Sequence, residues 1–392
     1  MNLSILNTEV QDFINANLNE DISKLLLNGI SFSEIEAKDI IKQIEAKKRS
    51  KKKLPTWFNS KNIYFPNKLN IEQTSSEVTA NYKANLVSGN SLIDLTGGFG
   101  VDAYYFSKRI KNVIHCEINK SLSEIVKHNY KTLNINTIEC LNENGIEALK
   151  HIDRPFDWIY IDPSRRDDTK KKVFLLSECI PNIKTFKGLF LKYANNVMIK
   201  TSPLLDIKAT LNDLKQIKEL HVIALDNEVK ELLWVLERDC KTEFIIKTVN
   251  LTKQSKQEFE FSFENESNEI AEYTGPIAYL YEPNAAILKA GAFNSVSTQL
   301  NIPKLHKHSH LYTSNTLIDF PGRRFKIEKS IPFNKKIFAK EKISKANVTT
   351  RNFPISVGEI RKKLKIKDGG DIYLFFTTDL NNIKIILVCL KA

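Results

Sequence analysis

The stretch Leu92-Ile93-Asp94-Leu95-Thr96-Gly97-Gly98-Phe99-Gly100 decides the fold of this chain. A short apolar run carries one carboxylate, and a cluster of glycines follows it at once. Glycines let the backbone approach a ligand closely, and a helix that begins after them offers free N–H groups. We therefore predict a strand over 91–95, a glycine turn and a helix over 102–109. Because the carboxylate of Asp94 would repel a phosphate, the pattern favours a ligand with a cationic amino group.

A second acidic residue follows at the distance that a nucleoside-binding fold requires. Residues 112–117, Asn-Val-Ile-His-Cys-Glu, read as the next strand and end on Glu117. The separation from Asp94 is 117 − 94 = 23 residues, near the roughly 20 residues at which a doubly wound fold places its ribose-binding acid. A carboxylate accepts hydrogen bonds from both hydroxyls of a ribose. The alternatives are a glycine turn that serves packing alone and an acid that is merely solvated.

A third acid ends another apolar strand. Residues 156–166 read Phe-Asp-Trp-Ile-Tyr-Ile-Asp-Pro-Ser-Arg-Arg, so the strand runs directly into Asp162 and Pro163. Carboxylates at the carboxyl ends of parallel strands face the ligand crevice, and a proline stiffens the backbone there. Arg165 and Arg166 add planar, permanent charges that suit phosphate or nucleobase contacts.

Together, the stretch 94–100, Glu117 and the run Asp-Pro-Ser-Arg at 162–165 resemble a class I S-adenosylmethionine-dependent methyltransferase. That run is similar to the Asp/Asn-Pro-Pro-Tyr motif of enzymes that methylate exocyclic base nitrogens, but it lacks the aromatic residue that stacks on the flipped base. The whole chain resembles a bacterial family of RNA methyltransferases with a ferredoxin-like segment and a THUMP-like C-terminal domain. The stretches that carry this resemblance are Glu-Gln-Thr-Ser-Ser-Glu at 72–77, Tyr-Glu-Pro-Asn-Ala-Ala at 281–286 and Arg-Asn-Phe-Pro at 351–354.

The resemblance implies S-adenosylmethionine as the cofactor and a nucleobase of structured RNA, in rRNA or tRNA, as the methyl acceptor. The residues expected to contact the cofactor are Asp94, Thr96, Gly97, Gly98, Gly100, Asp102, Glu117 and Asn144. For the adenine contact of Asn144, Asn142 and Glu143 remain alternatives. The expected catalytic residues are Asp162, Pro163 and Arg165, and the expected substrate-binding residues are Arg165, Arg166 and Lys200.

Strands and helices alternate from residue 91 to about residue 250, which predicts a largely parallel sheet with helices on both faces. The expected strands are 91–95, 112–117, 136–140, 157–162, 195–200, 219–225 and 243–249. The expected helices are 102–109, 119–133, 144–150, 173–193, 206–216 and 227–232. The fold class is therefore α/β, a Rossmann-like, seven-stranded methyltransferase sheet. An alternating segment, 258–264, is expected as a further, half-buried strand.

Four domains are expected along the chain. Residues 1–72 form an N-terminal helical domain that ends in a basic linker, and residues 73–275 form the methyltransferase domain. Residues 276–320 form the ferredoxin-like segment and residues 321–392 a THUMP-like α+β domain. The basic run 47–53 holds six positive charges in seven residues, and it reads as a solvated linker or as a patch that follows phosphates. A capping box over 74–77 is expected to open a helix.

The composition of the chain indicates which kinds of partner it can bind. The net charge of +12 and the pI near 9.2 favour a polyanionic partner such as RNA, although a lysine-rich proteome has the same effect. No apolar run of about 18 residues is present, so no membrane span is predicted. The first residues lack the features of a secretory signal, and five scattered cysteines read as reduced thiols, so a cytoplasmic monomer is expected. His306, His308 and His310 would share one face of a strand, but no metal is expected there.

Three rival functions were weighed. A nicotinamide-dependent dehydrogenase would carry Gly-x-Gly-x-x-Gly, whereas residues 97–102 read Gly-Gly-Phe-Gly-Val-Asp. A methyltransferase that acts on a protein or a small molecule would share the cofactor site but would leave the basic C-terminal half unexplained. A non-catalytic RNA-binding protein would tolerate the loss of Asp162.

Overall fold

A computed structural model describes the 392-residue chain except for residue 33 and residues 166–175. The chain divides into two compact units, residues 1–218 with 232–241, and residues 219–231 with 242–392. Each unit is treated by itself. Within the described part of the chain, none of the helices combines the length and the hydropathy that a bilayer crossing requires.

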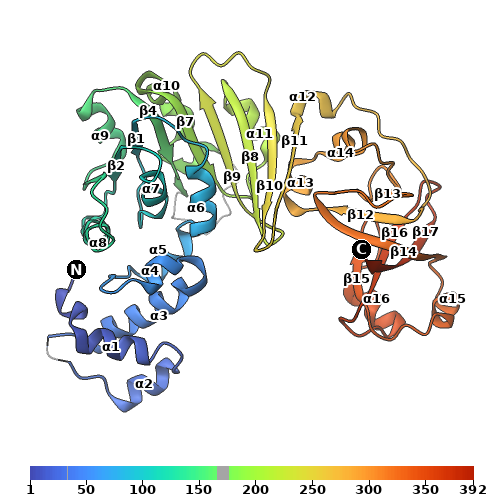
Figure 1. Cartoon of the computed structure of the whole chain (residues 1–392), viewed down its shortest axis with the longest axis horizontal. Coiled ribbons are helices and arrows are strands. Elements are labelled where there is room, and N and C mark those ends of the chain that lie inside the picture. The colour runs from blue at the N-terminus through green and yellow to red at the C-terminus, as the bar shows by residue number, and fades with distance from the viewer. Residues whose placement is uncertain (33, 166–175) are drawn as a thin grey trace. The chain divides into compact units, whose positions relative to one another are not determined.

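Short helices open the first unit (Figure 1). They are η1 (Leu3–Leu6), α1 (Thr8–Ala16), α2 (Ile22–Asn28), α3 (Ala37–Lys53), α4 (Pro55–Asn59) and α5 (Lys68–Gln73). The apolar residues spaced at helical intervals in the sequence form one core, whose fully buried members include Ile5, Ile14, Ile40 and Ile44. The expected N-terminal helical region is thus present.

The basic run 47–53 is helical rather than a linker, because it forms the last turns of α3. Lys47 is 7% exposed and lies over the rings of Phe58 and Phe65. Lys53 donates to the carbonyls of residues 71 and 72 at the end of α5, and Arg49 pairs with Glu72. Part of this charge therefore fastens α3 to its neighbours.

A nine-stranded sheet follows, in the order β11-β10-β8-β9-β7-β4-β1-β2-β3. Its strands are β1 (Ser91–Asp94), β2 (Asn112–Cys116), β3 (Ile138–Leu141), β4 (Phe156–Ile161), β7 (Ala194–Thr201), β8 (Ile217–Leu225), β9 (Glu228–Glu237), β10 (Ile245–Leu251) and β11 (Lys256–Ser262). α6 (Glu77–Ala84) precedes β1, and the helices between the strands are α7 (Val101–Phe106), α8 (Lys120–Thr132), α9 (Gly145–Ile152), α10 (Ile183–Tyr193) and α11 (Ile207–Asp213). Strands β3, β2, β1, β4 and β7 are parallel, so their carboxyl ends share one edge.

The α/β class is confirmed, but the sheet has nine strands rather than seven. The helix expected over 227–232 is wrong, because β9 runs there, antiparallel to β7. Asp226 and Asn227 both have positive φ angles, of 49° and 64°. Two consecutive residues of this kind make the tight turn that suits a β-hairpin, and Asp-Asn tolerates it better than most pairs. The second additional strand, β11, covers the segment read as an alternating strand in the sequence.

Two other expected elements differ from the structure. α10 begins at Ile183, not at 173, and is preceded by η2 (Leu176–Glu178) and by β6 (Cys179–Ile180). β6 pairs with β5 (Ser164–Arg165), the two residues that follow Pro163. The cap of α6 is Ser76, not Thr74, and its hydroxyl accepts from the N–H of Thr79.

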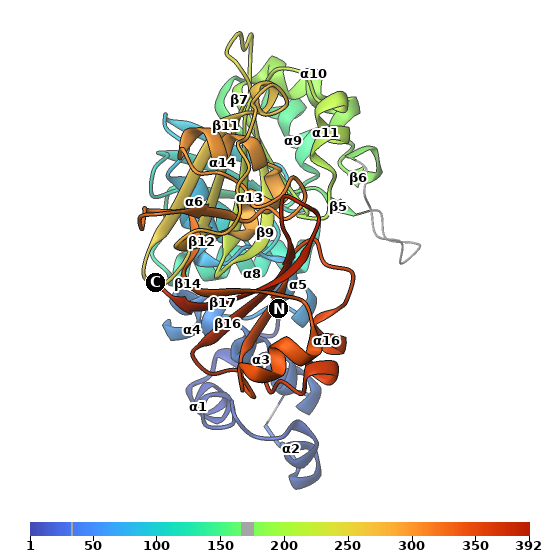
Figure 2. The same cartoon turned by 90° about the vertical axis from the view of Figure 1, so that its right-hand side faces the viewer.

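The remaining elements lie in the second unit. They are α12 (Phe263–Glu266), β12 (Tyr279–Pro283), α13 (Ala285–Ala290), α14 (Phe293–Gln299), β13 (Tyr312–Ser314), β14 (Gly322–Pro332), α15 (Lys335–Lys340), β15 (Asn347–Thr350), α16 (Val357–Leu364), β16 (Ile372–Thr378) and β17 (Lys384–Lys391). A six-stranded sheet has the order β13-β12-β14-β17-β16-β15, and Figure 2 shows β14, β17 and β16 side by side. Segments 276–320 and 321–392, expected as separate domains, thus share one sheet.

The three histidines do not share the face of a strand, since residues 307–309 form a turn and none of residues 306–310 belongs to a strand. The Nδ1 atom of His306 lies 3.1 Å from the N–H of His308 and 3.0 Å from the amide of Asn352. Its Nε2 atom lies 3.2 Å from Oδ1 of Asn382. In this pattern Nδ1 accepts hydrogen bonds and Nε2 donates one. Among the residues that the structure describes, no three His, Cys, Asp or Glu side chains are arranged to hold a metal.

Candidate active site

The carboxyl ends of β1, β2 and β4 are tied together by hydrogen bonds around the glycine turn. Thr96, just past β1, accepts the N–H of Asp162 at its hydroxyl over 2.6 Å. On the other side, the N–H of Gly97 donates to the carbonyl of Cys116 over 2.8 Å. The turn therefore fixes the spacing of three strand ends that each carry an acid expected from the sequence.

Asp94 lies at the centre of this arrangement and is only 1% exposed. Its Oδ1 atom accepts the N–H of Thr96 over 3.0 Å, which sets the direction of the carboxylate. Burial raises the pKa of Asp94 well above its ordinary value, and the neighbouring carboxylates of Asp102, Asp162 and Glu117 raise it further. A cationic ligand would relieve this repulsion, whereas an anionic one would add to it.

Two glycines of the turn have no room for a side chain. A Cβ atom on Gly97 would lie 2.2 Å from Nε2 of His115, a buried residue of β2. A Cβ atom on Gly100 would lie 2.2 Å from the hydroxyl of Tyr130, which donates to the Gly100 carbonyl. Burial lowers the pKa of His115 to about 4, so its ring is neutral at physiological pH. The loop consequently rests on uncharged rings.

The third glycine, Gly98, faces open space. Its φ angle is +54°, and a Cβ atom there would meet nothing closer than a carbonyl at 3.8 Å. Its N–H donates to Oε2 of Glu117 over 3.0 Å, and the N–H of Asn119 donates to Oε1 over 2.7 Å. Each carboxylate oxygen of Glu117 thus has one backbone donor and keeps a second acceptor position. This is the arrangement that a pair of ribose hydroxyls could use.

Asp162 and Lys200 form an ion pair across β4 and β7, with Nζ of Lys200 against Oδ2 of Asp162. The side chain of Lys200 is 12% exposed and that of Asp162 is 33% exposed. The sequence placed these residues in separate roles, as a catalytic acid and a substrate contact. The structure brings them together at adjacent parallel strands, because residues 161 and 199 are register partners.

Asp102 belongs to a buried network rather than to the exposed edge. Its Oδ2 atom accepts the hydroxyls of Ser75 and Tyr160, each over 2.8 Å, and its Oδ1 atom lies 3.1 Å from Nζ of Lys83. Burial by itself would raise the pKa of Asp102, but Lys83, Lys200 and the two hydroxyls outweigh it, so the pKa is lowered. These partners favour a supporting role for Asp102, and its direct contact with a cofactor stays a prediction.

The amides that follow β3 have local partners. Oδ1 of Asn144 accepts the N–H of Ile146 and so caps α9. Nδ2 of Asn142 donates to the carbonyls of Glu117 and Ile118, which joins the ends of β2 and β3. Asn142 therefore lies beside the Glu117 strand end, and the choice of Asn144, Asn142 or Glu143 as the adenine contact stays a prediction.

The remaining predicted residues are only partly described. Pro163 is half-buried, directly after Asp162. The backbone of Arg165 pairs with Cys179 in the short β5–β6 ladder. Arg166 lies outside the described residues.

Several functional partners were not found from the sequence. Lys83 is fully buried beside Asp102, although nothing in its local pattern distinguishes it from a surface lysine of a helix. The carboxylate of Glu77 accepts from the backbone and hydroxyl of Thr56, each over 2.6 Å, and from the hydroxyl of Tyr105 over 2.7 Å. The stretch 72–77 was noticed for its resemblance, and its acids and hydroxyls prove to fasten α4 and α6 onto α7.

Comparison with known proteins shows the family of this chain. A ferredoxin-like domain family matches residues 279–321, and a THUMP domain-like family matches residues 322–391. A crystal structure named "putative methyltransferase" from Porphyromonas gingivalis W83 is 32% identical to this chain. It covers 99% of this chain and 98% of its own, with a TM-score of 0.88. The chain belongs to this methyltransferase family.

Other solved structures are much less similar to this chain. A protein named "a putative methyltransferase" from Streptococcus mutans, in complex with SAH, is 15% identical and covers 41% of this chain and 96% of its own, with a TM-score of 0.31. TrmK of M. capricolum, also in complex with S-adenosyl-homocysteine, is 17% identical and covers 41% and 68%, with a TM-score of 0.31. Likeness of this size carries no argument about function. No curated protein matches the chain.

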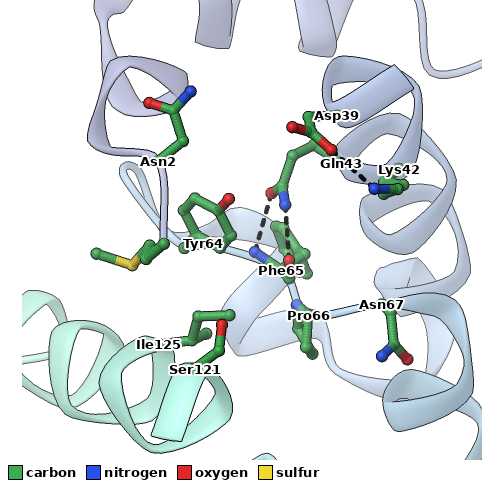
Figure 3. Close-up of a pocket in the computed structure, with 11 residues that line it drawn as sticks. Asn2, Asp39, Lys42, Gln43, Tyr64, Phe65, Pro66, Asn67, Ser121 and Ile125 are labelled. Atoms are coloured by element: carbon green, nitrogen blue, oxygen red, sulfur yellow. Dashed lines mark hydrogen bonds and ion pairs between the residues drawn. The ribbon is translucent and has the colours of Figure 1, made fainter. Parts of the chain in front are cut away.

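The methyltransferase has a separate hollow of about 290 Å³ between its N-terminal helices and α8 (Figure 3). In the figure Nε2 of Gln43 donates to the carbonyl of Phe65, and Oε1 of Gln43 accepts the N–H of Phe65. Lys42 forms an ion pair with Asp39. None of the strand-end acids lines this hollow. It is therefore not the site that the glycine turn organises.

Proposed function

We propose that this chain transfers a methyl group from S-adenosylmethionine to a nucleobase of structured RNA. The observation that carries the proposal is the gathering of Asp94, Glu117 and Asp162 at the edge where parallel strands end. Asp94 is buried there and its pKa is raised, which is costly for the protein unless a positive charge is bound. Nicotinamide cofactors bring a pyrophosphate to this position, whereas S-adenosylmethionine brings an ammonium group and a sulfonium centre.

The residues fit such a cofactor. Asp94, Thr96 and the backbone of the glycine turn would hold its amino-acid end, and Gly98 leaves open space above the turn. Glu117 keeps two acceptor positions for ribose hydroxyls while its other positions are bound by backbone N–H groups. Asn144, or else Asn142 or Glu143, would meet the adenine.

The chemistry asks little of the protein beyond alignment. When bound, S-adenosylmethionine supplies a methyl group that is already electrophilic. Lys200 holds Asp162 through its Oδ2 atom, and in the described part of the chain Oδ1 has no hydrogen-bond partner. Oδ1 is thus positioned to accept a hydrogen bond from an amino group of the acceptor base, which orients the nitrogen lone pair. The stiff peptide of Pro163 keeps this carboxylate in place. Arg165 and Arg166 remain proposed contacts to the base or its phosphate.

Support for an RNA acceptor comes from the second unit and from the charge. Residues 322–391 match the THUMP domain-like family, and the chain carries a net charge of +12. Basic α+β surfaces suit the backbone and shape contacts by which folded RNA is recognised. A base inside a duplex must be unstacked before its nitrogen can reach the cofactor, and this costs least in single-stranded loops.

Two measurements test the proposal. Calorimetry with S-adenosylhomocysteine should give saturable heat, and the absence of heat would reject a cofactor role. Tritiated methyl transfer should then be assayed on total RNA, protein and lipid fractions from cells that lack the protein. Label in RNA supports the proposal, and label in the protein or lipid fraction would replace RNA as the acceptor. An Asp162→Ala variant that keeps the full rate would remove Asp162 from the mechanism.

A further inference from the structure

The second unit contains a buried glutamate that holds two arginines. Glu282 on β12 is only 2% exposed, and both of its oxygens are occupied. Oε2 accepts from Nε and Nη2 of Arg323, which faces it on β14 as its register partner. Oε1 accepts from Nε and Nη2 of Arg351, over 3.0 Å and 2.8 Å. One negative charge thus holds two positive ones.

The sheet must curl for this contact to form. Three strands, β14, β17 and β16, separate β12 from β15 in the sheet order, yet Arg351 directly follows β15 and reaches Glu282. The contact joins the stretches 281–286 and 351–354, which both carry the family resemblance. Two arginines on one carboxylate leave the cluster with a net charge of +1.

Both arginines present an unused edge to the outside. Their side chains remain 45% and 34% exposed, for Arg323 and Arg351 respectively. Each uses Nε and Nη2 on Glu282, and within the described residues neither Nη1 has a hydrogen-bond partner. The guanidinium of Arg323 also lies 5.5 Å from the ring centre of Phe325, which fixes its plane. Planar groups with one edge fixed and the other free lose little entropy when they bind a second anion.

The surroundings of Arg351 are electropositive. Burial, together with the charges of Lys304, Arg351 and His308, lowers the pKa of His310 to about 4. Lys304 is 2% exposed, so burial lowers its pKa, and the negative charge of Glu266 acts in the opposite direction. The carboxylate of Glu266 also accepts hydrogen bonds from N–H groups at the N-terminus of α14. Glu282 and Glu266 are both bound to hydrogen-bond donors, Glu282 to the two arginines and Glu266 to N–H groups of α14.

We infer that Arg323 and Arg351, held on Glu282, form a two-armed site for the phosphodiester backbone of RNA. This inference rests on the proposed RNA acceptor and adds the residues that grip it outside the methyl-transfer centre. Arginine forks match phosphate oxygens in planar pairs of hydrogen bonds, and two forks on one carboxylate can grip one phosphate or two neighbouring ones. The site reads no sequence and serves to set the position of the RNA.

The test compares full-length Arg323→Gln and Arg351→Gln variants with Lys326→Gln as a matched control. Lys326 lies on the same strand as Arg323, is 59% exposed and pairs with Glu328, so its loss removes the same charge nearby. Binding of a fluorescently labelled RNA hairpin is measured by anisotropy over a salt series. Each arginine variant should weaken binding about tenfold or more. Each should also reduce the slope of log affinity against log salt by about 1.

Arg323→Lys and Arg351→Lys variants separate a loss of RNA binding from a loss of the fold. Each keeps a positive charge that pairs with Glu282 but lacks the second guanidinium edge that would bind a phosphate. They should melt like the parent and bind RNA with intermediate affinity. An unchanged slope in the glutamine variants, or an equal change in Lys326→Gln, overturns the inference while RNA binding by the parent protein stands. If the parent binds no RNA, the proposed acceptor fails as well. Stronger displacement by polyglutamate than by RNA would identify an acidic peptide instead.

Discussion

Replacing Asp94 with Asn tests the charge at the centre of the site and leaves its shape intact. The amide oxygen of Asn can still accept the N–H of Thr96, which now lies 3.0 Å from Oδ1. What disappears is the negative charge that would meet the ammonium group of the cofactor. A hydrogen bond to a charged group contributes about 1.5–3 kcal/mol, so affinity for S-adenosylhomocysteine should fall roughly 10- to 100-fold.

The same change should not destabilise the protein. A raised pKa means that the folded state binds the proton more tightly than the unfolded chain. Asp94 therefore contributes stability below about pH 4, and this contribution is lost as the pH rises through the folded-state pKa. Asn avoids that loss, so the melting temperature of Asp94→Asn at neutral pH should equal or exceed that of the parent.

Asp157→Asn is the matched control, because Asp157 lies at the opposite end of β4. Its Oδ2 atom accepts the N–H of Asn90 over 2.7 Å, and this hydrogen bond is the main reason why the pKa of Asp157 is lowered. This carboxylate adds stability above the unfolded-state pKa and loses it in acid. Asp157→Asn should therefore melt earlier at neutral pH and bind S-adenosylhomocysteine as the parent does.

Calorimetry at several pH values measures the affinity for S-adenosylhomocysteine, and thermal melts measure the melting temperature. In the parent, cofactor affinity should rise with pH as Asp94 loses its proton, and in Asp94→Asn the affinity should be independent of this step. If Asp94→Asn binds as tightly as the parent, the argument from a buried charge is wrong. A melting temperature that falls as far as that of Asp157→Asn would mean that the carboxylate is structural.

Two further changes probe the glycine turn and the ion pair. Gly97→Ala should cost about 1–3 kcal/mol of stability because its Cβ would lie 2.2 Å from His115, whereas Gly188→Ala in α10, which meets nothing within 4 Å, should be neutral or stabilising in the same melts. Equal melting temperatures would show that the turn relaxes. Lys200→Met should leave S-adenosylhomocysteine binding intact but slow methyl transfer about tenfold or more, since Asp162 loses the partner that orients it; an unchanged rate in the tritium assay would show that the pair is incidental.

The positions of most strands along the chain, and the acids at their ends, were predictable from local pattern. Each apolar run that ended on Asp94, Glu117 or Asp162 became a parallel strand with the acid at its carboxyl end. The β9 strand was missed because a helix and a buried strand look alike in a short apolar run. The positive φ angles of Asp226 and Asn227 form a hairpin turn, which makes the following segment a strand and not a helix. The residue types alone do not decide this, because many residue pairs can adopt a turn or a helical conformation.

The amino-acid sequence by itself determined the acids, the glycines and their order, because these features depend on a strand, a tight turn and a helix that are local in the chain. The tertiary structure decided which charges meet. Lys200 reaches Asp162, Lys83 reaches Asp102, and Arg351 reaches Glu282 across distances of up to 69 residues. No periodicity records such pairs, since they arise only when separate strands and helices pack and bury their charged groups together.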